Sequence, residues 1–335
     1  MIEINRQEAF EIAVDALAEH GISGSAAEQT SEVLLSADAR GKHSHGLLRL
    51  PRIIRGITQG NVDPEGTIEV VSQQGGTVAI DGGARLGPVV ASVATDKAIA
   101  RAEKCGIGAV GVHNSNHLGI LGYYTEQILQ NGFIGIGMTN TEPAMPPHGG
   151  DDPILGTNPI AVGLPTDPVF NLDMSTASIA RGTVLQYRET DRDLPSGVAL
   201  DANGRPTTDP SAALDGTVLP FGGYRGSGLA IAIEVLAGGL VGAEMGTDVT
   251  GTFHTEDPCT KGDLFLAIDP GAFGVGDFDS RVSAFFDEVT TDESTPGNDG
   301  VRLPGQRSGQ RDRSASTVQV EADLWNELRA LAGAD

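Results

Sequence analysis

The sequence has little cysteine and little that suggests secretion or membrane insertion. Its two cysteines, Cys105 and Cys259, lie far apart among 335 residues, which argues against a disulfide framework or a thiolate metal site and favours a reducing compartment. The first twenty residues alternate apolar and charged side chains with a helical period, unlike a secretory signal or an anchor. The longest apolar stretch, 228–243, contains Glu234 and is short for a bilayer span. We therefore expect a soluble, cytoplasmic protein without a membrane partner.

Basic residues are scarce as well. Lys and Arg total 22 against 45 Asp and Glu, which gives a net charge of −23, and only 4 of the 22 are Lys. Nucleic acids and anionic membranes need a cationic face, so we expect no nucleic-acid partner. The acid-rich, Lys-poor composition favours a halophilic protein in a salt-adapted cytoplasm, where ions screen the self-repulsion. A disordered acidic chain is excluded because apolar residues are patterned everywhere except over 291–316.

The apolar periodicity predicts an α/β chain without internal repeats. Helices are expected over 6–19, 26–39, 47–60, 88–104, 120–131, 177–187, 226–243, 278–290 and 318–332. Strands are expected over 67–71, 77–81, 107–112, 133–140, 159–165, 170–174 and 264–269. Asn5 with Glu8 and Ser25 with Glu28 have the spacing of capping boxes, and Asn203-Gly204 predicts a type I′ hairpin turn. The helix over 226–243 is apolar on most sides and is expected to be buried.

One glycine pattern resembles a dinucleotide-binding turn. Gly106, Gly108 and Gly111 have GxGxxG spacing, but that motif must follow a strand and open a helix. Here the glycines lie inside the β-rich run IGAVGV, and no helix is expected for several residues after it. We therefore interpret them as part of an ordinary glycine-rich strand and expect no Rossmann fold.

The histidines are clustered. Five of the seven lie in three polar segments, HSHG (43–46), HNSNHLG (113–119) and PPHGG (146–150). No carboxylate or thiolate is placed to complete a metal site, so we predict no bound metal. A neutral imidazole beside hydroxyl and amide groups suits proton transfer at a carbinol or carbonyl carbon.

An arginine follows the first histidine cluster at helical spacing. Arg49 would share a helix face with His45, and its planar guanidinium could bind a carboxylate through two hydrogen bonds. Together these residues suit a 2-hydroxy or 2-oxo acid, although they would also fit a solvated helix face. Three further segments could bind an anion or could be structural turns, and these are LDMSTASIARG (172–182), GGYRGSG (222–228) and PGQR (304–307).

Eight segments in order along the chain resemble the malate/L-lactate dehydrogenase type of NAD(P)-dependent oxidoreductases, which includes sulfolactate, ureidoglycolate and diketogulonate-type enzymes. The segments are RGKHSHGLLRL (40–50), HNSNHLGILGYY (113–124), TNTEPAMPPHGG (139–150), LGTNPIAVGLP (155–165), LDMSTASIARG (172–182), GVALDANGRPTTDP (197–210), PFGGYRGSGLAI (220–231) and VRLPGQR (301–307). The resemblance covers nearly the whole chain.

The resemblance implies an α/β (α+β) fold that is not a Rossmann fold. A helical portion built from both chain ends, 1–75 with 291–335, would carry dimerisation and substrate functions. A mixed, largely antiparallel sheet domain, 76–290, would hold NAD or NADP. The resemblance also implies a homodimer with the site near the subunit boundary.

The resemblance further implies which residues form the site. His117 would accept the alcohol proton, His45 and Ser44 would polarise the oxygen, and Arg49 would bind the carboxylate, although either histidine can lead within the family. The implied cofactor contacts are Asn140, Asp173, Met174, Ser175, Tyr224, Arg225, Gly305, Gln306 and Arg307. Arg225 and Thr183 both stand where the family usually has Lys.

The expected function is hydride transfer between a nicotinamide and a small 2-hydroxy acid of the malate, lactate or sulfolactate type. A reductase of cyclic imino acids within the same family is one alternative. A metal-dependent or non-catalytic binding relative is another.

Overall fold

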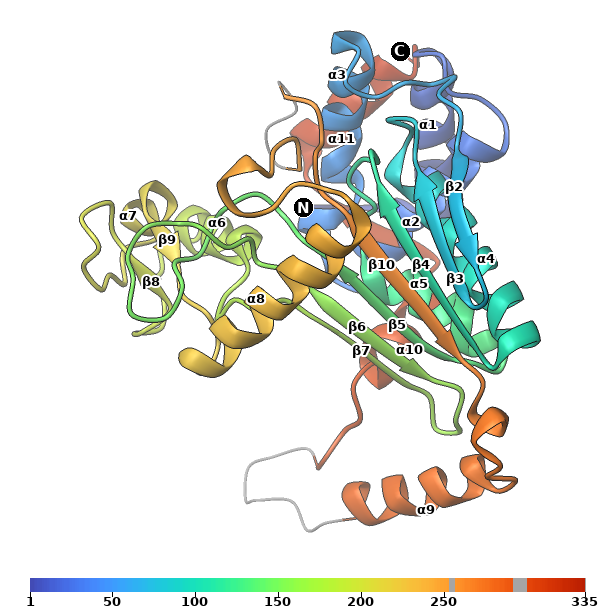
Figure 1. Cartoon of the computed structure of the whole chain (residues 1–335). Helices are drawn as coiled ribbons and strands as arrows, with labels where there is room; N and C mark the ends of the chain where they lie inside the picture. The colour runs from blue at the N-terminus through green and yellow to red at the C-terminus, as the bar shows by residue number, and fades with distance from the viewer. Residues whose placement is uncertain (253–256, 292–299, 335) are drawn as a thin grey trace.

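The computed structural model describes residues 1–252, 257–291 and 300–334. A twisted sheet crosses the molecule, with a layer of helices at one end and a small lobe at the other (Figure 1). The sheet has seven strands in the order β2-β3-β4-β10-β5-β6-β7. Its strands are β2 (Glu69–Gln74), β3 (Thr77–Asp81), β4 (Ile107–His113), β10 (Asp263–Ile268), β5 (Ile134–Thr139), β6 (Ile160–Leu164) and β7 (Phe170–Met174).

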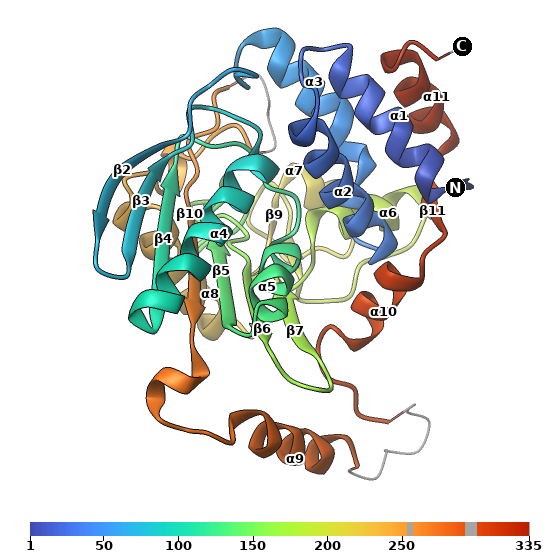
Figure 2. The same ribbon diagram turned by 90° about the vertical axis from the view of Figure 1, so that its right-hand side faces the viewer.

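The strand pairing confirms the expected sheet. β3 and β4 run parallel, and every other neighbouring pair of this sheet is antiparallel. Helices α4 (Gly87–Cys105) and α5 (Leu121–Gln130) cover one face, and α8 (Tyr224–Ala237) crosses the other (Figures 1 and 2). Alternating buried residues such as Val110, Val112 and Phe265 fill the space beneath α4 and α5. The fold is therefore a mixed, largely antiparallel α/β arrangement and not a Rossmann fold.

The GxGxxG glycines have structural roles. Gly106 ends α4 in a left-handed conformation with φ 77°, where glycine carries no steric penalty. A Cβ on Gly108 would lie 2.0 Å from the carbonyl oxygen of Ala98, so glycine lets α4 pack directly against β4. Both Gly108 and Gly111 lie inside β4, which confirms that the pattern is not a dinucleotide turn.

A helical layer joins the two ends of the chain. Strand β1 (Ile2–Asn5) pairs antiparallel with β11 (Thr317–Val320). Helices α1 (Arg6–Ala18), α2 (Ser25–Ala39), α3 (Leu50–Gln59) and α11 (Ala322–Leu331) pack around a shared core that includes Leu17, Leu34, Leu50 and Trp325. The two-domain division stays a prediction. Its boundary at residue 75 falls between β2 and β3, which pair with each other in the sheet.

The small lobe has a core of its own. It contains α6 (Arg181–Glu189), α7 (Pro210–Asp215), β8 (Ala199–Leu200) and β9 (Thr217–Val218), packed around Met145, Val184 and Leu194. Helix α9 (Phe278–Thr290) lies at the lower edge of the molecule in Figure 2. The Phe286 ring of α9 stacks on Phe170 with the ring centroids 5.8 Å apart. Helix α10 (Gln306–Ser314) follows and leads into β11.

Local signals at helix ends gave mixed results. The Asn5 side chain accepts hydrogen bonds from the backbone amides of Gln7 and Glu8, as the first capping box predicts. Ser25 does not cap, because α2 already begins at Ser25 and Gly24 occupies the cap position without a side-chain hydrogen bond. The closing helix was expected to start at 318, but residues 317–320 pair with β1 and the helix starts at Ala322.

Four other expectations were wrong in detail. The segment 47–60 was expected to be one helix, but it begins with the 3-10 turn η2 (Leu47–Arg49), which follows another 3-10 turn, η1 (His43–His45), and α3 starts only at Leu50. Helix α6 begins at Arg181 rather than 177. The turn near Asn203 is not type I′, because the amide of Gly204 bonds to Asp201 O and the central residues of that turn do not have positive φ. Helix α8 is not buried all round, since it exposes several large apolar side chains.

Candidate active site

The structure brings two of the sequence-predicted histidines together. His45 lies in η1 and His117 lies in the loop after β4, and their ring centroids are 5.5 Å apart at an interplanar angle of 35°. The rings therefore approach from two separate segments of the chain and can contact one small ligand.

A buried carboxylate shapes the segment that carries His45. Asp38 in α2 has one oxygen 2.9 Å from His43 Nδ1, and its other oxygen accepts a hydrogen bond from the Leu47 amide at 2.7 Å. A Cβ on Gly46 would lie 2.2 Å from Asp38 Cγ, so only glycine fits between the two 3-10 turns. The hydrogen bond to Asp38 raises the pKa of His43. Asp38 therefore anchors the turn on both sides of Ser44 and His45.

Ser44 and Arg49 adjoin His45. Ser44 Oγ lies 2.9 Å from His45 Nδ1. Arg49 Nε donates to Ser44 O at 2.7 Å, and its Nη1 donates to Thr252 O at 3.3 Å. Arg49 was expected to meet His45 on one α-helix face. It reaches Ser44 instead because two 3-10 turns joined at Gly46 replace that α-helix.

Burial and nearby cations keep both imidazoles neutral. Burial, followed by the charges of Arg49 and Lys42, lowers the pKa of His45 to about 3. Burial and Arg49 lower the pKa of His117 well below its usual value. Burial and Arg52 lower the pKa of Arg49 to about 10, which still leaves the guanidinium charged near neutral pH. The site therefore combines two neutral imidazoles with a fixed positive charge.

The hydrogen bonds distinguish the two histidines. The Gly119 amide donates to His117 Nδ1 at 3.2 Å, so the neutral ring must carry its proton on Nε2. The partner of His45 Nδ1 is a hydroxyl, which can either donate or accept. His117 is therefore set up as a hydrogen-bond donor, whereas His45 can exist in either tautomer.

A second group of predicted residues lines a pocket beside this segment. Lys42 Nζ lies 2.6 Å from Asp173 Oδ2, which also accepts the Gly122 amide at 3.0 Å. The pocket has a volume of about 210 Å³ and is lined by Arg40, Lys42, Asn171, Leu172, Asp173, Pro304, Gly305 and Ser308. It thus joins two of the sequence-derived cofactor segments, the end of β7 and the loop before α10.

Gly305 allows these two segments to meet. It has φ 87°, and a Cβ there would lie 2.7 Å from Asn171 O. Sequence reasoning missed Arg40 and Lys42 in this pocket. The available signal was their position inside the RGKHSHG motif, four and two residues before Ser44.

Asn140 is buried in a polar network. Its Nδ2 donates to Glu234 Oε1 and to Glu244 O, both at 2.9 Å, and its Oδ1 accepts the Gly262 amide at 2.8 Å. Ser175 Oγ similarly donates to Thr157 O at 3.0 Å. These hydrogen bonds hold backbone segments together, so both side chains have a positioning role within the protein.

The other predicted cofactor residues lie around the pocket or outside it. Met174 is the last residue of β7, Gln306 and Arg307 form the first turn of α10, and Gln306 Oε1 accepts the Leu303 amide at 3.0 Å. Tyr224 and Arg225 begin α8, with the guanidinium 5.3 Å from the Tyr224 ring centroid. Neither Tyr224 nor Arg225 lines the pocket.

Two further observations concern ligands and membranes. Within residues 1–252, 257–291 and 300–334, no group of three or more His, Cys, Asp or Glu is arranged to hold a metal ion. Within the same residues, the stretch Tyr224–Val241 is long and apolar enough to cross a membrane by length and composition alone, and 44% of it is buried. One such stretch is weak evidence, because core helices of water-soluble proteins share these properties.

Comparison with known proteins now identifies the family. The family model described as malate/L-lactate dehydrogenase matches residues 4–329. The chain belongs to the malate/L-lactate dehydrogenase family. This member of the family is an NAD(P)-dependent oxidoreductase that acts on hydroxy acids.

Similar members of the malate/L-lactate dehydrogenase family include enzymes named for sulfolactate. A malate/(S)-sulfolactate dehydrogenase from Methanothermus fervidus is 41% identical over 98% of this chain and 97% of its own length. The solved structure of sulfolactate dehydrogenase from Methanocaldococcus jannaschii matches with a TM-score of 0.94 at 40% identity, covering 100% of this chain and 98% of that chain. A Δ(1)-pyrroline-2-carboxylate reductase from Ancylobacter novellus is 32% identical over 98% of this chain and 97% of its own length.

Proposed function

We propose that this dehydrogenase acts on a 2-hydroxy acid that carries a second acidic group, as sulfolactate and malate do. The observation that carries the proposal is the close approach of His45 and His117, both half-buried, beside the charged and half-buried Arg49. The Arg49 fork would bind the carboxylate next to the hydroxyl carbon. Arg52, three residues further on in α3, adds a second positive charge close enough to lower the pKa of Arg49. Arg49 and Arg52 could thus pair with the two acidic groups of such a substrate.

The hydrogen bonds suggest a role for each imidazole. His117 Nε2–H would donate to the substrate oxygen, and His45 would accept the hydroxyl proton on Nε2 while its Nδ1–H turns toward Ser44 Oγ. In the free protein the positive charge of Arg49 disfavours protonation of His45. A bound substrate carboxylate would offset the charge of Arg49 and so raise the pKa of His45. This assignment exchanges the roles that the family resemblance favoured.

The nicotinamide cofactor would supply or accept the hydride at this site. We propose that its dinucleotide extends into the pocket beside Lys42, Asp173 and Gly305. The fit is supported by the close backbone approach at Gly305 and by the Lys42 ammonium at the pocket wall. The first turn of α10, with Gln306 and Arg307, would face an anionic group. Met174, Tyr224 and Arg225 remain proposed contacts.

The direct test is a substrate panel in molar KCl, which suits the proposed halophilic cytoplasmic protein. Absorbance at 340 nm is followed with sulfolactate, malate and lactate, each with NAD and with NADP. We expect sulfolactate or malate to give a kcat/KM at least about tenfold above that of lactate, because lactate lacks a second group to pair. EDTA is expected to leave the rate unchanged.

The same panel includes Δ(1)-pyrroline-2-carboxylate with NADH and NADPH, for the less supported alternative of an imino acid reductase. Turnover of this compound alone would contradict the hydroxy-acid proposal. Loss of turnover on chelation would instead support a metal-dependent relative.

We also propose that the enzyme is a homodimer and that the outer face of α8 lies in its interface. Ile231, Val235, Leu236 and Leu240 are each 37–65% exposed along this helix and the turn after it. A contiguous apolar face of this kind is typical of protein interfaces.

Val235→Glu is expected to convert the dimer to a monomer, because it would bury a charge in the interface. Light scattering coupled to size exclusion in high salt measures the mass. The matched control is Ile107→Glu, which places the same charge at an apolar side chain of 44% exposure outside α8. A dimeric Val235→Glu variant, or a monomeric wild type, would contradict this interface.

A further inference from the structure

An ion-pair network adjoins the pocket of Lys42, Asp173 and Gly305, which is called the nucleotide pocket below. Asp312 of α10 is the centre of this network. Asp312 Oδ1 accepts a hydrogen bond from Arg6 Nη1 at 2.9 Å. Its Oδ2 accepts from Ser36 Oγ at 2.5 Å and from Arg40 Nε at 2.9 Å. One carboxylate thus connects α10 to α1 and α2, which are far away along the sequence.

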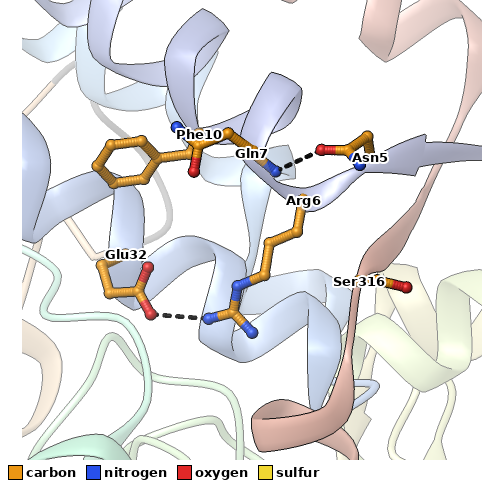
Figure 3. A pocket seen from close by; sticks show the side chains of 6 residues that line it. All are labelled: Asn5, Arg6, Gln7, Phe10, Glu32 and Ser316. Atoms are coloured by element: carbon orange, nitrogen blue, oxygen red, sulfur yellow. Dashed lines mark hydrogen bonds and ion pairs between the residues drawn. The ribbon is translucent and has the colours of Figure 1, made fainter.

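The inner and outer parts of this network differ in their exposure to water. The side chains of Arg40 and Asp312 are 7% and 13% exposed, whereas Glu32, which pairs with Arg6 at 2.7 Å, is 42% exposed. Figure 3 shows the Arg6–Glu32 pair facing a pocket of about 420 Å³. Ion pairs near water contribute little, while breaking a buried pair leaves an uncompensated charge. The contacts to Asp312 therefore dominate the network.

Two routes lead from Asp312 to the nucleotide pocket. Arg40 bonds to Asp312, pairs with Glu126 of α5 and also lines the pocket. Asp312 also fixes α10, whose first turn follows Gly305 in the pocket wall. Asp312 therefore holds both Arg40 and α10, although Asp312 itself does not line the pocket.

We infer that Asp312 is a positioning residue for nucleotide binding, because it holds Arg40 and α10 in the arrangement that forms the pocket. This inference rests on the proposed place of the dinucleotide. A carboxylate that only joined the two chain ends would affect folding stability and leave nucleotide affinity unchanged. Nucleotide affinity therefore separates the two roles.

The experiment measures dissociation constants of NADH and NADPH by fluorescence titration of the full-length protein in molar KCl. Asp312→Asn is expected to weaken binding of the preferred nucleotide about tenfold, as substitutions within coupled networks do. Asp312→Glu is expected to recover part of the affinity. The KM for the hydroxy acid at saturating nucleotide should stay within about twofold of wild type, because the partners of Asp312 are Arg6, Ser36 and Arg40 and none of these is a proposed hydroxy-acid contact.

If Asp312→Asn does not fold, two variants at Arg6 and at its partner Glu32 still test the inference. Arg6→Gln removes a donor to Asp312 and is expected to weaken nucleotide binding about threefold. Glu32→Gln removes the other partner of Arg6 without touching α10, and we expect wild-type affinity. Unchanged affinity in both Asp312→Asn and Arg6→Gln overturns the inference, as does equal weakening in Glu32→Gln. A wild type that binds neither nucleotide overturns the proposed function itself.

Discussion

His45→Ala is expected to lower kcat about a thousandfold, because a positioned general base contributes about 10²- to 10⁴-fold. His45 Nδ1 lies 2.9 Å from Ser44 Oγ, and the ring is neutral in the free protein. His45 can therefore accept the proton of the substrate hydroxyl group. His117→Ala should also reduce kcat severely, since it removes a donor to that oxygen. Steady-state kinetics in both directions, with nucleotide binding measured separately, checks both variants.

Glutamine variants distinguish the two roles. His117→Gln retains an N–H donor and should recover part of the rate lost in His117→Ala. His45→Gln cannot transfer a proton and should be as slow as His45→Ala. If His117→Gln remains inactive while His45→Ala keeps more than about a tenth of the wild-type rate, the roles are reversed and His117 is the base.

Arg49→Lys is expected to raise the KM for the hydroxy acid about 30-fold, because a hydrogen bond to a charged group is worth about 1.5–3 kcal/mol. Lysine keeps the positive charge but lacks the planar guanidinium that binds a carboxylate through two hydrogen bonds. Arg49 Nε also holds Ser44 O at 2.7 Å, so we expect a smaller accompanying fall in kcat.

The matched control for this prediction is Arg55→Lys, at an exposed position of α3, the helix that follows Arg49. It should leave both kinetic constants unchanged. An unchanged KM in Arg49→Lys would place the carboxylate site elsewhere, with Arg52 as the next residue to test.

The main part of the fold could be predicted because its signals are local. Alternating strands such as 77–81 and periodic helices such as 278–290 have the predicted bounds. Errors occurred where distant residues decide the outcome. Residues 317–320 were expected to be helical, but they pair with β1 at the other end of the chain. Ser25 could have been a cap or the first helical residue, and its spacing from Glu28 is compatible with both.

The site shows the same distinction. The motifs predicted His45, His117 and Arg49, but not the carboxylate of Asp38 that fixes the segment carrying His45, nor the Lys42–Asp173 pair in the pocket. Those contacts depend on chain folding between α2, the turn at Gly46 and β7. The exposed face of α8 was likewise not predictable, because hydropathy alone does not distinguish a buried core helix from one that meets another surface.

The pairing of β1 with β11 has a consequence for biosynthesis. Strand β1 is synthesised long before β11, and the core around Leu17 needs Trp325 of α11. Helices α1, α2 and α3 therefore expose apolar surface until α11 has been made, and nascent chains in such a state are prone to aggregation. Since α2 and α3 flank the turn with Ser44 and His45, we expect this turn to take its native position only after β11 and α11 have packed against β1 and α1.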